Sequence, residues 1–240
     1  MTKCFALVAT MSALVFSAAG AATESGSFTV SVSGIRAGTL AYEGTVNGDS
    51  YLARGSARAS GLLGAILDVR ADAAAEGRIK GTQLAPQTAS ERIREDGEEF
   101  KKTYRFNSVG TPNINREPAR KKPRKHAADP NAQRGVVDPM TAAFAILRDQ
   151  TDDTACALDI ASFDGARRSR LLLKSREQTN DGVICRGDYI REAGFSPKEM
   201  SERVVWPVTL EYSRRGDGTL QVKELSFPTS FGPARIRRQN

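Results

Sequence analysis

The chain has 240 residues, a formal net charge of +7, 40% hydrophobic residues, three cysteines and one histidine. The histidine count excludes a zinc site built from several histidines and makes any Ser-His-Asp triad depend on His126 alone. Lys3 contributes one of the seven net charges and residues 116–126 contribute five, so the rest of the chain is close to neutral. Because the excess of positive charge is confined to one segment and does not cover a whole face of the fold, it argues against nucleic acid as a partner.

The N-terminus has the layout of a secretory signal peptide. Lys3 supplies a positive charge, residues 4–19 are uncharged and largely apolar, and Ala19-Gly20-Ala21 offers small residues for cleavage. A membrane-spanning helix needs about 20 apolar residues, more than this run provides. We therefore expect a signal peptide over residues 1–21, cleaved near Ala21 or Ala22. The mature part, residues 22–240, is expected to be a periplasmic domain with no transmembrane segment.

Two cysteines remain after cleavage, because Cys4 lies within the predicted signal peptide. Cys156 and Cys185 lie 29 positions apart, and an even pair in an exported protein favours one disulfide. A reactive thiol is the alternative, but the chain has no C-x-x-C motif and only His126 as a histidine partner. We expect the bridge, which would stabilise the fold by about 3 to 4 kcal/mol through the loop that it closes.

The first half of the mature chain alternates apolar and polar residues in short runs between turns, the pattern of half-buried strands. Asn47-Gly48 is typical of a type I′ hairpin turn, and Asp96-Gly97 marks another turn. Strands are expected over residues 28–33, 40–46, 51–60 and 67–75, and on both sides of Asp96-Gly97.

Small side chains share one face of the third expected strand, which carries Tyr51, Ala53, Gly55, Ala57 and Ala59. Such a face lets another element approach closely, or lets the sheet curve. Two interpretations stay open. A helix packs against this face, or the face lines a ligand cavity. In the second case the ligand would contact Tyr51, Ala53, Gly55 and Ala57, and Phe144 would help to close the cavity.

Residues 107–135 interrupt the strand pattern with four prolines and a cluster of basic side chains. This composition predicts a disordered basic insert. Either it is a solvated loop without a partner, or it contacts an anionic surface such as lipid head groups or lipopolysaccharide phosphates. The contact residues would be Arg120, Lys121, Lys122, Arg124 and Lys125.

A helix is expected to follow the insert. Asp138 is a good N-cap and Pro139 suits the first helical position. Apolar residues then recur at the i, i+3, i+4 and i+7 spacing of one helix face: Met140, Ala143, Phe144 and Leu147. The pattern predicts one short amphipathic helix packed on the sheet.

The second half returns to strands, expected over residues 156–160, 168–177, 183–190, 204–212 and 220–227. Turn residues separate them, for example Asp164-Gly165 and Asp217-Gly218. Regular short strands with such turns predict a mainly β fold. We expect a curved antiparallel sheet, half-barrel or sandwich-like, as a single domain whose two sheet halves are joined by the short helix.

The motif Phe163-Asp164-Gly165-Ala166-Arg167-Arg168 lies between the two cysteines, and Ala193-Gly194-Phe195 follows the second. Together with the helix start at Asp138-Pro139, these residues resemble a family of exported proteobacterial proteins known as domain of unknown function 3108. The resemblance covers most of the mature chain but not the basic insert. It implies a curved sheet similar in outline to periplasmic lipoprotein carriers, and it implies no activity, because fold-level likeness transfers no function.

Residues suited to catalysis are scarce. The sequence has no G-x-S-x-G motif, and one histidine with two paired cysteines cannot supply a zinc site. The carboxylates that suit a glycosidase-like pair, Glu91 with Glu95 or Asp159 with Asp164, are explained by ordinary surface charge. We expect no enzymatic activity, no cofactor and no metal.

Arg167 and Arg168 follow the Asp164-Gly165 turn and point to opposite faces of the next expected strand. One of them can bind an anionic ligand, since guanidinium pairs bidentately with oxyanions. A purely structural hairpin is the alternative.

Three functions remain open from the sequence. The first is a periplasmic protein that binds an apolar or amphipathic cell-envelope component, such as a lipid or lipopolysaccharide, in its curved sheet. The second is an envelope scaffold that engages a protein partner through an edge strand or the basic insert. The third is a carboxylate-dependent envelope-polymer hydrolase. A deep apolar pocket favours the first function, and two facing carboxylates in a polar groove favour the third.

Overall fold

The computed structural model of the protein describes residues 21–61, 69–95 and 97–239. The predicted signal peptide, apart from Ala21, lies outside the described residues, and so do Leu67 of the fourth expected strand and Asp96 of the expected turn. Seven strands form the first half: β1 (Ala22–Val32), β2 (Ile35–Asn47), β3 (Ser50–Ala59), β4 (Arg70–Lys80), β5 (Gln83–Glu95), β6 (Glu98–Phe106) and β7 (Pro112–Glu117). Six form the second half: β8 (Asp159–Phe163), β9 (Arg168–Gln178), β10 (Gly182–Ala193), β11 (Val205–Arg214), β12 (Leu220–Thr229) and β13 (Gly232–Arg238).

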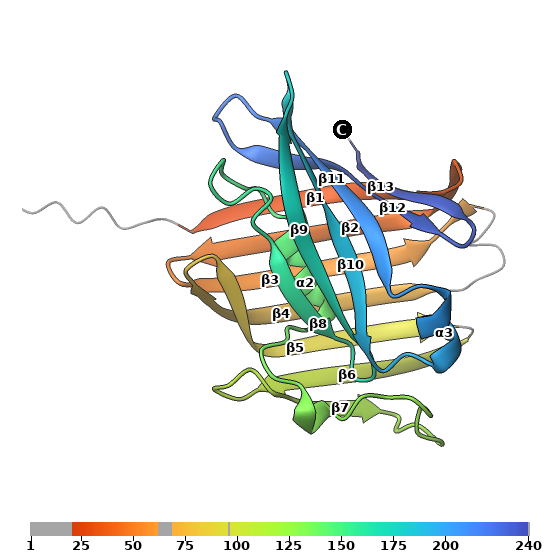
Figure 1. The fold of residues 1–240 in the computed structure, drawn as a ribbon. Coiled ribbons are helices and arrows are strands. Elements are labelled where there is room, and N and C mark those ends of the chain that lie inside the picture. Colours follow the sequence, from red (N-terminus) through yellow and green to blue (C-terminus); the bar gives the residue numbers. More distant parts are fainter. Residues whose placement is uncertain (1–20, 62–68, 96, 240) are drawn as a thin grey trace, which may run out of the picture.

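All thirteen strands belong to one antiparallel sheet, which confirms the predicted fold class (Figure 1). The order is β7-β6-β5-β4-β3-β2-β1-β13-β12-β11-β10-β9-β8, so β7 and β8 end the sheet and do not pair with each other. The two halves meet where β1 pairs with β13, with Phe28 opposite Arg238 and Val30 opposite Ile236. The sheet is therefore continuous. The prediction that the short helix joins two separate sheet halves is wrong, because β1 and β13 pair directly.

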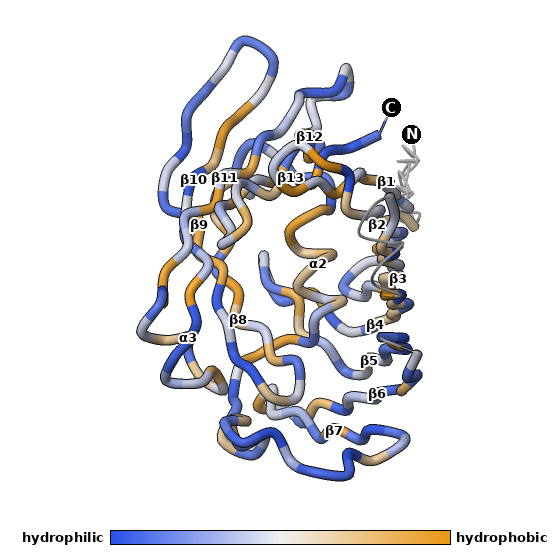
Figure 2. Tube along the Cα trace, turned by 90° about the vertical axis from the view of Figure 1, so that its right-hand side faces the viewer, coloured by the Kyte–Doolittle hydropathy of each residue, from blue (hydrophilic) through white to orange (hydrophobic). Residues whose placement is uncertain are grey.

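The sheet curves into two facing walls with a helix between them (Figure 2). This helix is α2 (Pro139–Leu147), and it contacts β3, β4, β5 and β8. A second helix, α3 (Pro197–Glu202), links β10 to β11 at one end of the molecule, and a short 3-10 turn, η1, covers Pro130–Ala132. The predicted amphipathic helix thus lies inside the curved sheet, and α3 was not predicted.

The alternation of the strands explains which side chains form the core. In β11, Val208, Leu210 and Tyr212 are buried, whereas the residues between them are more exposed. Phe144 of α2 is completely buried and lies against Tyr51 and Tyr42, with ring centroids 5.9 and 6.2 Å away. The interior of the first half is therefore built around one helical aromatic residue.

The prediction that residues 107–135 are disordered is wrong for part of the segment. Residues 112–117 form β7, which pairs with β6, and Pro130–Ala132 form η1. Ile114 packs against the core, and the Arg116 guanidinium lies 4.0 Å from the Phe100 ring centroid. Strand β7 can contain Pro112 because an edge strand tolerates proline. Ile114 is enough to anchor β7 to the core, because the neighbouring strand β6 supplies the hydrogen bonds. Within this segment, residues 107–111, 118–129 and 133–135 lack helix or strand.

Cys156 and Cys185 are bridged, as predicted, with their Cα atoms 5.2 Å apart. Cys185 belongs to β10 and is fully buried, whereas Cys156 lies in the loop between α2 and β8. The disulfide therefore ties this loop to the centre of the second wall.

None of the helices in the described ranges is long and apolar enough to span a membrane.

Candidate functional site

Among the described residues, three cavities lie beside helix α2 inside the curved sheet. The largest of the three has a volume of about 550 Å³ and lies between α2 and strands β8 to β12. A second, of about 310 Å³, lies on the side of α2 that faces β2 to β5. The third, of about 170 Å³, lies near the β4–β5 turn and the loop after α2. We call them the large, second and third cavities.

The large cavity is lined mainly by aliphatic and aromatic side chains. Helix α2 contributes Ala142 and Ile146, and the strands contribute the wall. The apolar and aromatic wall residues are Ile160, Leu171, Tyr189, Phe195, Trp206, Val208, Leu225, Phe227 and Phe231. Such a surface excludes water and favours apolar ligand groups.

Charged side chains gather at one part of this lining, around α3. Arg167, Arg191 and Glu199 all line the cavity, and Glu199 Oε1 accepts a hydrogen bond of 2.8 Å from Arg167 Nη2. Glu199 also completes a capping box with Ser196 at the start of α3. These hydrogen bonds from Ser196, together with the nearby charges of Arg167 and Arg191, lower the pKa of Glu199. We call Arg167, Arg191 and Glu199 the charged mouth.

Phe231 lies on the β12–β13 turn with 84% of its surface exposed. Figure 1 shows this turn and α3 at the same end of the molecule. The Phe231 side chain also lines the large cavity.

Most residues of the large cavity were not singled out from the sequence. Arg167 is the one predicted site residue that lines it. Trp206 and Tyr189 were counted only as strand residues, and Phe227 and Phe231 come from a hairpin whose second strand was missed. The signal that could have found the site is Trp206, the one tryptophan of the chain, on a strand near several other aromatic residues.

Some residues of the predicted small-residue face pack against α2, and others line the second cavity. Tyr51 and Ala53 are buried, and Tyr51 forms a 2.8 Å hydrogen bond with Thr141 of α2. A Cβ atom on Gly55 would lie 2.8 Å from Met140 Sδ, so this glycine lets the helix approach closely. Ala57 and Gly55 line the second cavity. Contacts with α2 thus account for Tyr51, Gly55 and Phe144, Ala53 is fully buried, and a smaller space remains beside Ala57.

The other predicted site residues lie away from the large cavity. Arg168 pairs with Glu192, and its guanidinium Nη1 donates to the Arg134 carbonyl. The predicted anionic-surface residues are all exposed in the loop that follows β7: Arg120, Lys121, Lys122, Arg124 and Lys125. The loop that carries these residues joins the body of the protein near its end, where the Ala128 backbone N–H donates a 2.8 Å hydrogen bond to the Ala166 carbonyl.

Comparison with known proteins identifies the family. The family model described as "Protein of unknown function (DUF3108)" matches residues 27–221. The chain belongs to this family. The resemblance seen in the motif from Phe163 to Arg168 is thereby confirmed. A comparison with curated proteins found no match.

One solved structure resembles the DUF3108 fold described here. It is the crystal structure of a beta-barrel-like protein of domain of unknown function DUF1849 from Brucella abortus. The two share 9% sequence identity over 90% of this chain and 95% of that chain, with a TM-score of 0.44.

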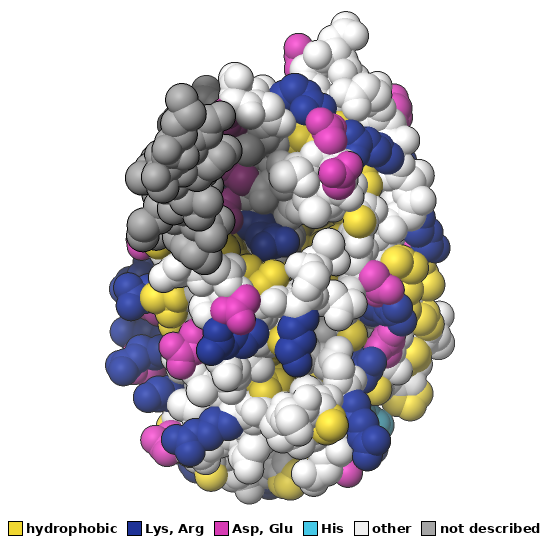
Figure 3. Space-filling model, turned by 90° about the vertical axis from the view of Figure 1, so that its left-hand side faces the viewer, with side chains coloured by type: hydrophobic (Ala, Val, Ile, Leu, Met, Phe, Trp, Pro, Cys, Tyr) yellow, Lys and Arg dark blue, Asp and Glu magenta, His cyan; other side chains and the backbone are white. Residues whose placement is uncertain are grey.

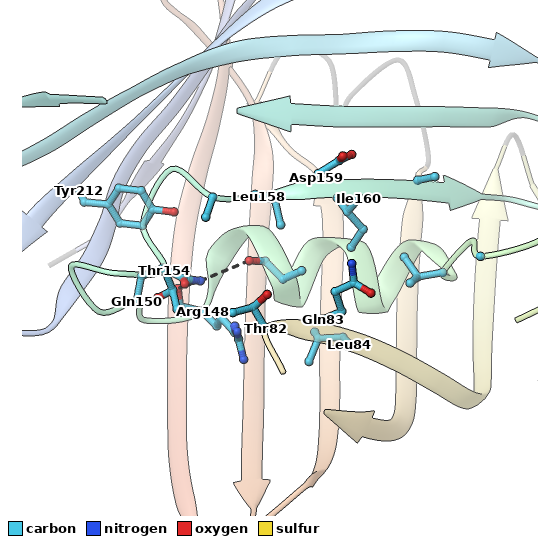
Figure 4. Close-up of a pocket in the computed structure, with 15 residues that line it drawn as sticks. Thr82, Gln83, Leu84, Arg148, Gln150, Thr154, Leu158, Asp159, Ile160 and Tyr212 are labelled. Atoms are coloured by element: carbon cyan, nitrogen blue, oxygen red, sulfur yellow. Dashed lines mark hydrogen bonds between the residues drawn. The ribbon is translucent and has the colours of Figure 1, made fainter. Parts of the chain in front are cut away.

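The third cavity of this DUF3108 protein is small and mixed in character. Arg148, Gln150 and Tyr212 line it together with apolar side chains, and Figure 4 shows these residues around the end of α2. Burial raises the pKa of the Tyr212 hydroxyl. Figure 3 shows this end of the molecule, where a hollow opens among basic, acidic and apolar side chains. A space of this size suits water or a small ion better than an apolar chain.

Three of the four carboxylates considered as catalytic pairs have structural partners. Glu91 is buried and accepts hydrogen bonds from Lys102 Nζ and the Tyr104 hydroxyl, at 3.2 and 3.1 Å. Glu95 is exposed. Asp159 forms an ion pair with Arg170, and Asp164 accepts the backbone N–H groups of its own turn. Across the described ranges, no group of three or more His, Cys, Asp or Glu is arranged to hold a metal ion.

Asp138 is a buried carboxylate with a structural role. It caps α2 by accepting hydrogen bonds from the backbone N–H groups of Met140 and Thr141, and its Oδ2 accepts a bond from the Thr141 hydroxyl. Burial raises the pKa of Asp138 to about 6, and the nearby charge of Glu91 also raises it. The hydrogen bonds from Thr141 act in the opposite direction but do not offset burial.

The raised pKa predicts a pH-dependent stability. The folded protein holds the Asp138 proton up to about pH 6, whereas the unfolded chain releases it near pH 4, so folding takes up a proton between these values. The free energy of unfolding should therefore fall by about 2 to 3 kcal/mol as the pH rises through this window. Asp138→Asn keeps a good N-cap and should remove this contribution, which urea unfolding at pH 4 and pH 7 would measure.

Asp217→Asn is the matched control. Hydrogen bonds from Thr219 lower the pKa of this exposed turn carboxylate, so its removal should alter the slope with the opposite sign. An Asp138→Asn variant whose stability keeps the wild-type pH slope would show that Asp138 is not the titrating group.

Proposed function

We propose that this DUF3108 protein is a non-enzymatic periplasmic binding protein. It takes an apolar or amphipathic component of the cell envelope into the large cavity. The observation that carries the proposal is the cavity itself, of about 550 Å³, with nine apolar or aromatic wall residues and a charged mouth at one part of its lining. Small-molecule sites are typically apolar cavities of about 300 to 1,000 Å³ with a few polar groups that orient the ligand.

The periplasmic location is supported by two features of the chain. The N-terminal layout is that of a secretory signal peptide, and the bridge between Cys156 and Cys185 is of the kind that persists in oxidising compartments. A lipid or lipopolysaccharide component is the envelope molecule whose chemistry suits the cavity, since it combines acyl chains with a polar head.

Binding is favoured over catalysis because the carboxylates near the interior have structural partners. Glu91 is held by Lys102 and Tyr104, and Asp138 caps α2. A hydrolase needs a carboxylate that is free to exchange a proton with substrate or water. The large cavity is lined by the single carboxylate Glu199, which is already engaged by Ser196 and Arg167.

The proposal predicts that an uncharged aromatic probe enters the large cavity. Trp206 is the one tryptophan of the chain and lines this cavity, so its emission reports on binding without a label. Titration with N-phenyl-1-naphthylamine should quench Trp206 and increase the emission of the probe. Ala142→Leu should weaken this binding by about tenfold or more, because the larger side chain occupies the cavity. Lipid extraction and mass spectrometry of the purified protein would identify the natural ligand.

Ala143→Leu is the matched control, since it places the same side chain on the same helix but toward the second cavity. It should leave the probe affinity within about twofold of the wild-type value. If neither the probe nor any extracted lipid binds, the ligand-binding proposal fails. A scaffolding role through the edge strand β7 then becomes the better explanation.

A further inference from the structure

Two arginines of the charged mouth contact the same aromatic ring, that of Phe195. The guanidinium carbons of Arg167 and Arg191 each lie 5.2 Å from the centroid of the Phe195 ring. Arg191 also lies 5.4 Å from the Trp206 ring. Cation–π contacts of this kind hold long side chains in place, so the two positive groups are fixed at the cavity before any ligand arrives.

The negative charge nearby does not balance both arginines. Arg167 forms an ion pair with Glu199, with 2.8 Å between Nη2 and Oε1. Arg191 forms no ion pair with a carboxylate of the described residues. Its Nη1 donates instead to the backbone carbonyls of Glu199 and Arg203, at 2.5 and 3.1 Å. Among the ionisable lining groups, two arginines and one glutamate leave a net positive charge.

The remaining donors of Arg191 are therefore available to a ligand. A guanidinium has five N–H donors in a planar fork, and the described protein contacts occupy one nitrogen of Arg191. The fork matches the oxygens of a carboxylate or a phosphate, and such hydrogen bonds gain strength next to an apolar surface. A cationic head group would be repelled here, and an uncharged one would leave the positive charge unbalanced.

We propose that the ligand of the large cavity is an acidic amphiphile whose carboxylate or phosphate binds Arg191, with Arg167 as a second contact. This inference rests on the proposed function and adds the head-group chemistry to it. The acyl part lies against the apolar wall between Ile146 and Leu171, and the oxyanion lies beside Phe195. Arg191 is the main contact because Glu199 already holds Arg167.

The test uses four amphiphiles with straight alkyl tails of nearly equal length and different head groups. Decanoate, decyl phosphate, decanol and decyltrimethylammonium are each titrated against the protein loaded with N-phenyl-1-naphthylamine, and displacement of the probe gives their affinities. Either acid should bind about tenfold or more tightly than decanol, and the ammonium compound should bind more weakly than decanol. The difference between decanoate and decyl phosphate tells which oxyanion the site prefers.

Variants connect the preference to the arginines. Arg191→Gln should reduce the ratio of acid to alcohol affinity to about one, whereas Arg191→Lys should keep part of it, because the positive charge remains but the fork is lost. Arg167→Gln should reduce the ratio by less than Arg191→Gln does. Arg186→Gln is the matched control, since Arg186 lies on the same strand but pairs with Glu177 at the surface. It should keep the wild-type ratio.

Failure of this inference differs from failure of the proposed function. Equal affinities of the acids and decanol for the wild-type protein would overturn the acidic head group while leaving a ligand-binding cavity. An acid preference that survives in Arg191→Gln and in Arg167→Gln would also overturn it, because other groups would then bind the head. If none of the four amphiphiles displaces the probe and the probe itself does not bind, both proposals fail.

Discussion

Replacing Phe144 by alanine should lower the free energy of unfolding by about 3 to 5 kcal/mol, the cost of removing a buried phenylalanine from a close-packed core. The Phe144 ring is completely buried, lies against Tyr51 and Tyr42, and occupies the space beside Gly44. These neighbours belong to rigid strands, so they cannot collapse into the void. Equilibrium unfolding in urea, followed by circular dichroism, would measure the loss.

Phe231→Ala is the control for this change, because the same side chain is removed from a position that is 84% exposed. Its effect on stability should stay within about 0.5 kcal/mol. A loss below about 1 kcal/mol for Phe144→Ala would mean that α2 does not organise the core as the structure indicates.

The packing of Phe144 on Gly44 offers an independent check. A Cβ atom on Gly44 would lie 2.1 Å from Phe144 Cε2, so Gly44→Ala should cost about 1 to 3 kcal/mol through overpacking. The backbone of Gly44 does not have a positive φ, so the cost is steric. Combining Gly44→Ala with Phe144→Leu should cost less than the two single changes together, since the smaller side chain makes room.

The strand content of the fold could be predicted because it depends on local pattern. Alternating residues such as Val208, Leu210 and Tyr212 mark a half-buried strand wherever its partner lies. The start of α2 was also local, since Asp138 caps the helix with its own carboxylate. The strands that were missed, β7 and β13, carry few bulky apolar residues and are fixed by pairing with their neighbours.

Long-range arrangement could not be read from the same pattern. The sheet is continuous because Phe28 pairs opposite Arg238, at the other end of the chain, and no local signal specifies that pairing. The position of α2 inside the curved sheet follows from this long-range pairing, which joins the two halves into one curved sheet. An amphipathic helix packed on one face of a flat sheet would have shown the same i, i+3, i+4, i+7 spacing.

Most residues of the candidate site could not be predicted from the sequence, because they come together only through this long-range arrangement. Its lining comes from α2, from strands β8 to β12 and from the β12–β13 turn, and each strand residue alone is typical of a core. Arg167 was singled out because it follows a recognisable turn. Arg191 was not, because an arginine on a strand gives no sign that it lies over Phe195 and Trp206.

The disulfide gives the second large effect on stability. Changing Cys156 and Cys185 together to alanine should lower the free energy of unfolding by about 3 to 4 kcal/mol, because the bridge closes a loop with a sequence separation of 29. Alanine is preferred to serine, since Cys185 is fully buried and a hydroxyl there would need a hydrogen-bond partner.

A reductant tests the same bridge in the wild-type protein. In buffer containing dithiothreitol the stability of the wild type should fall toward that of the double variant, whereas the double variant should not respond. The loop that carries Cys156 leads into β8, which forms part of the large-cavity wall, so probe binding should weaken in parallel. Mass spectrometry would verify that the wild-type protein is fully reduced. If the reduced protein then unfolds at the same urea concentration as the oxidised form, the bridge does not contribute to the stability of this wall.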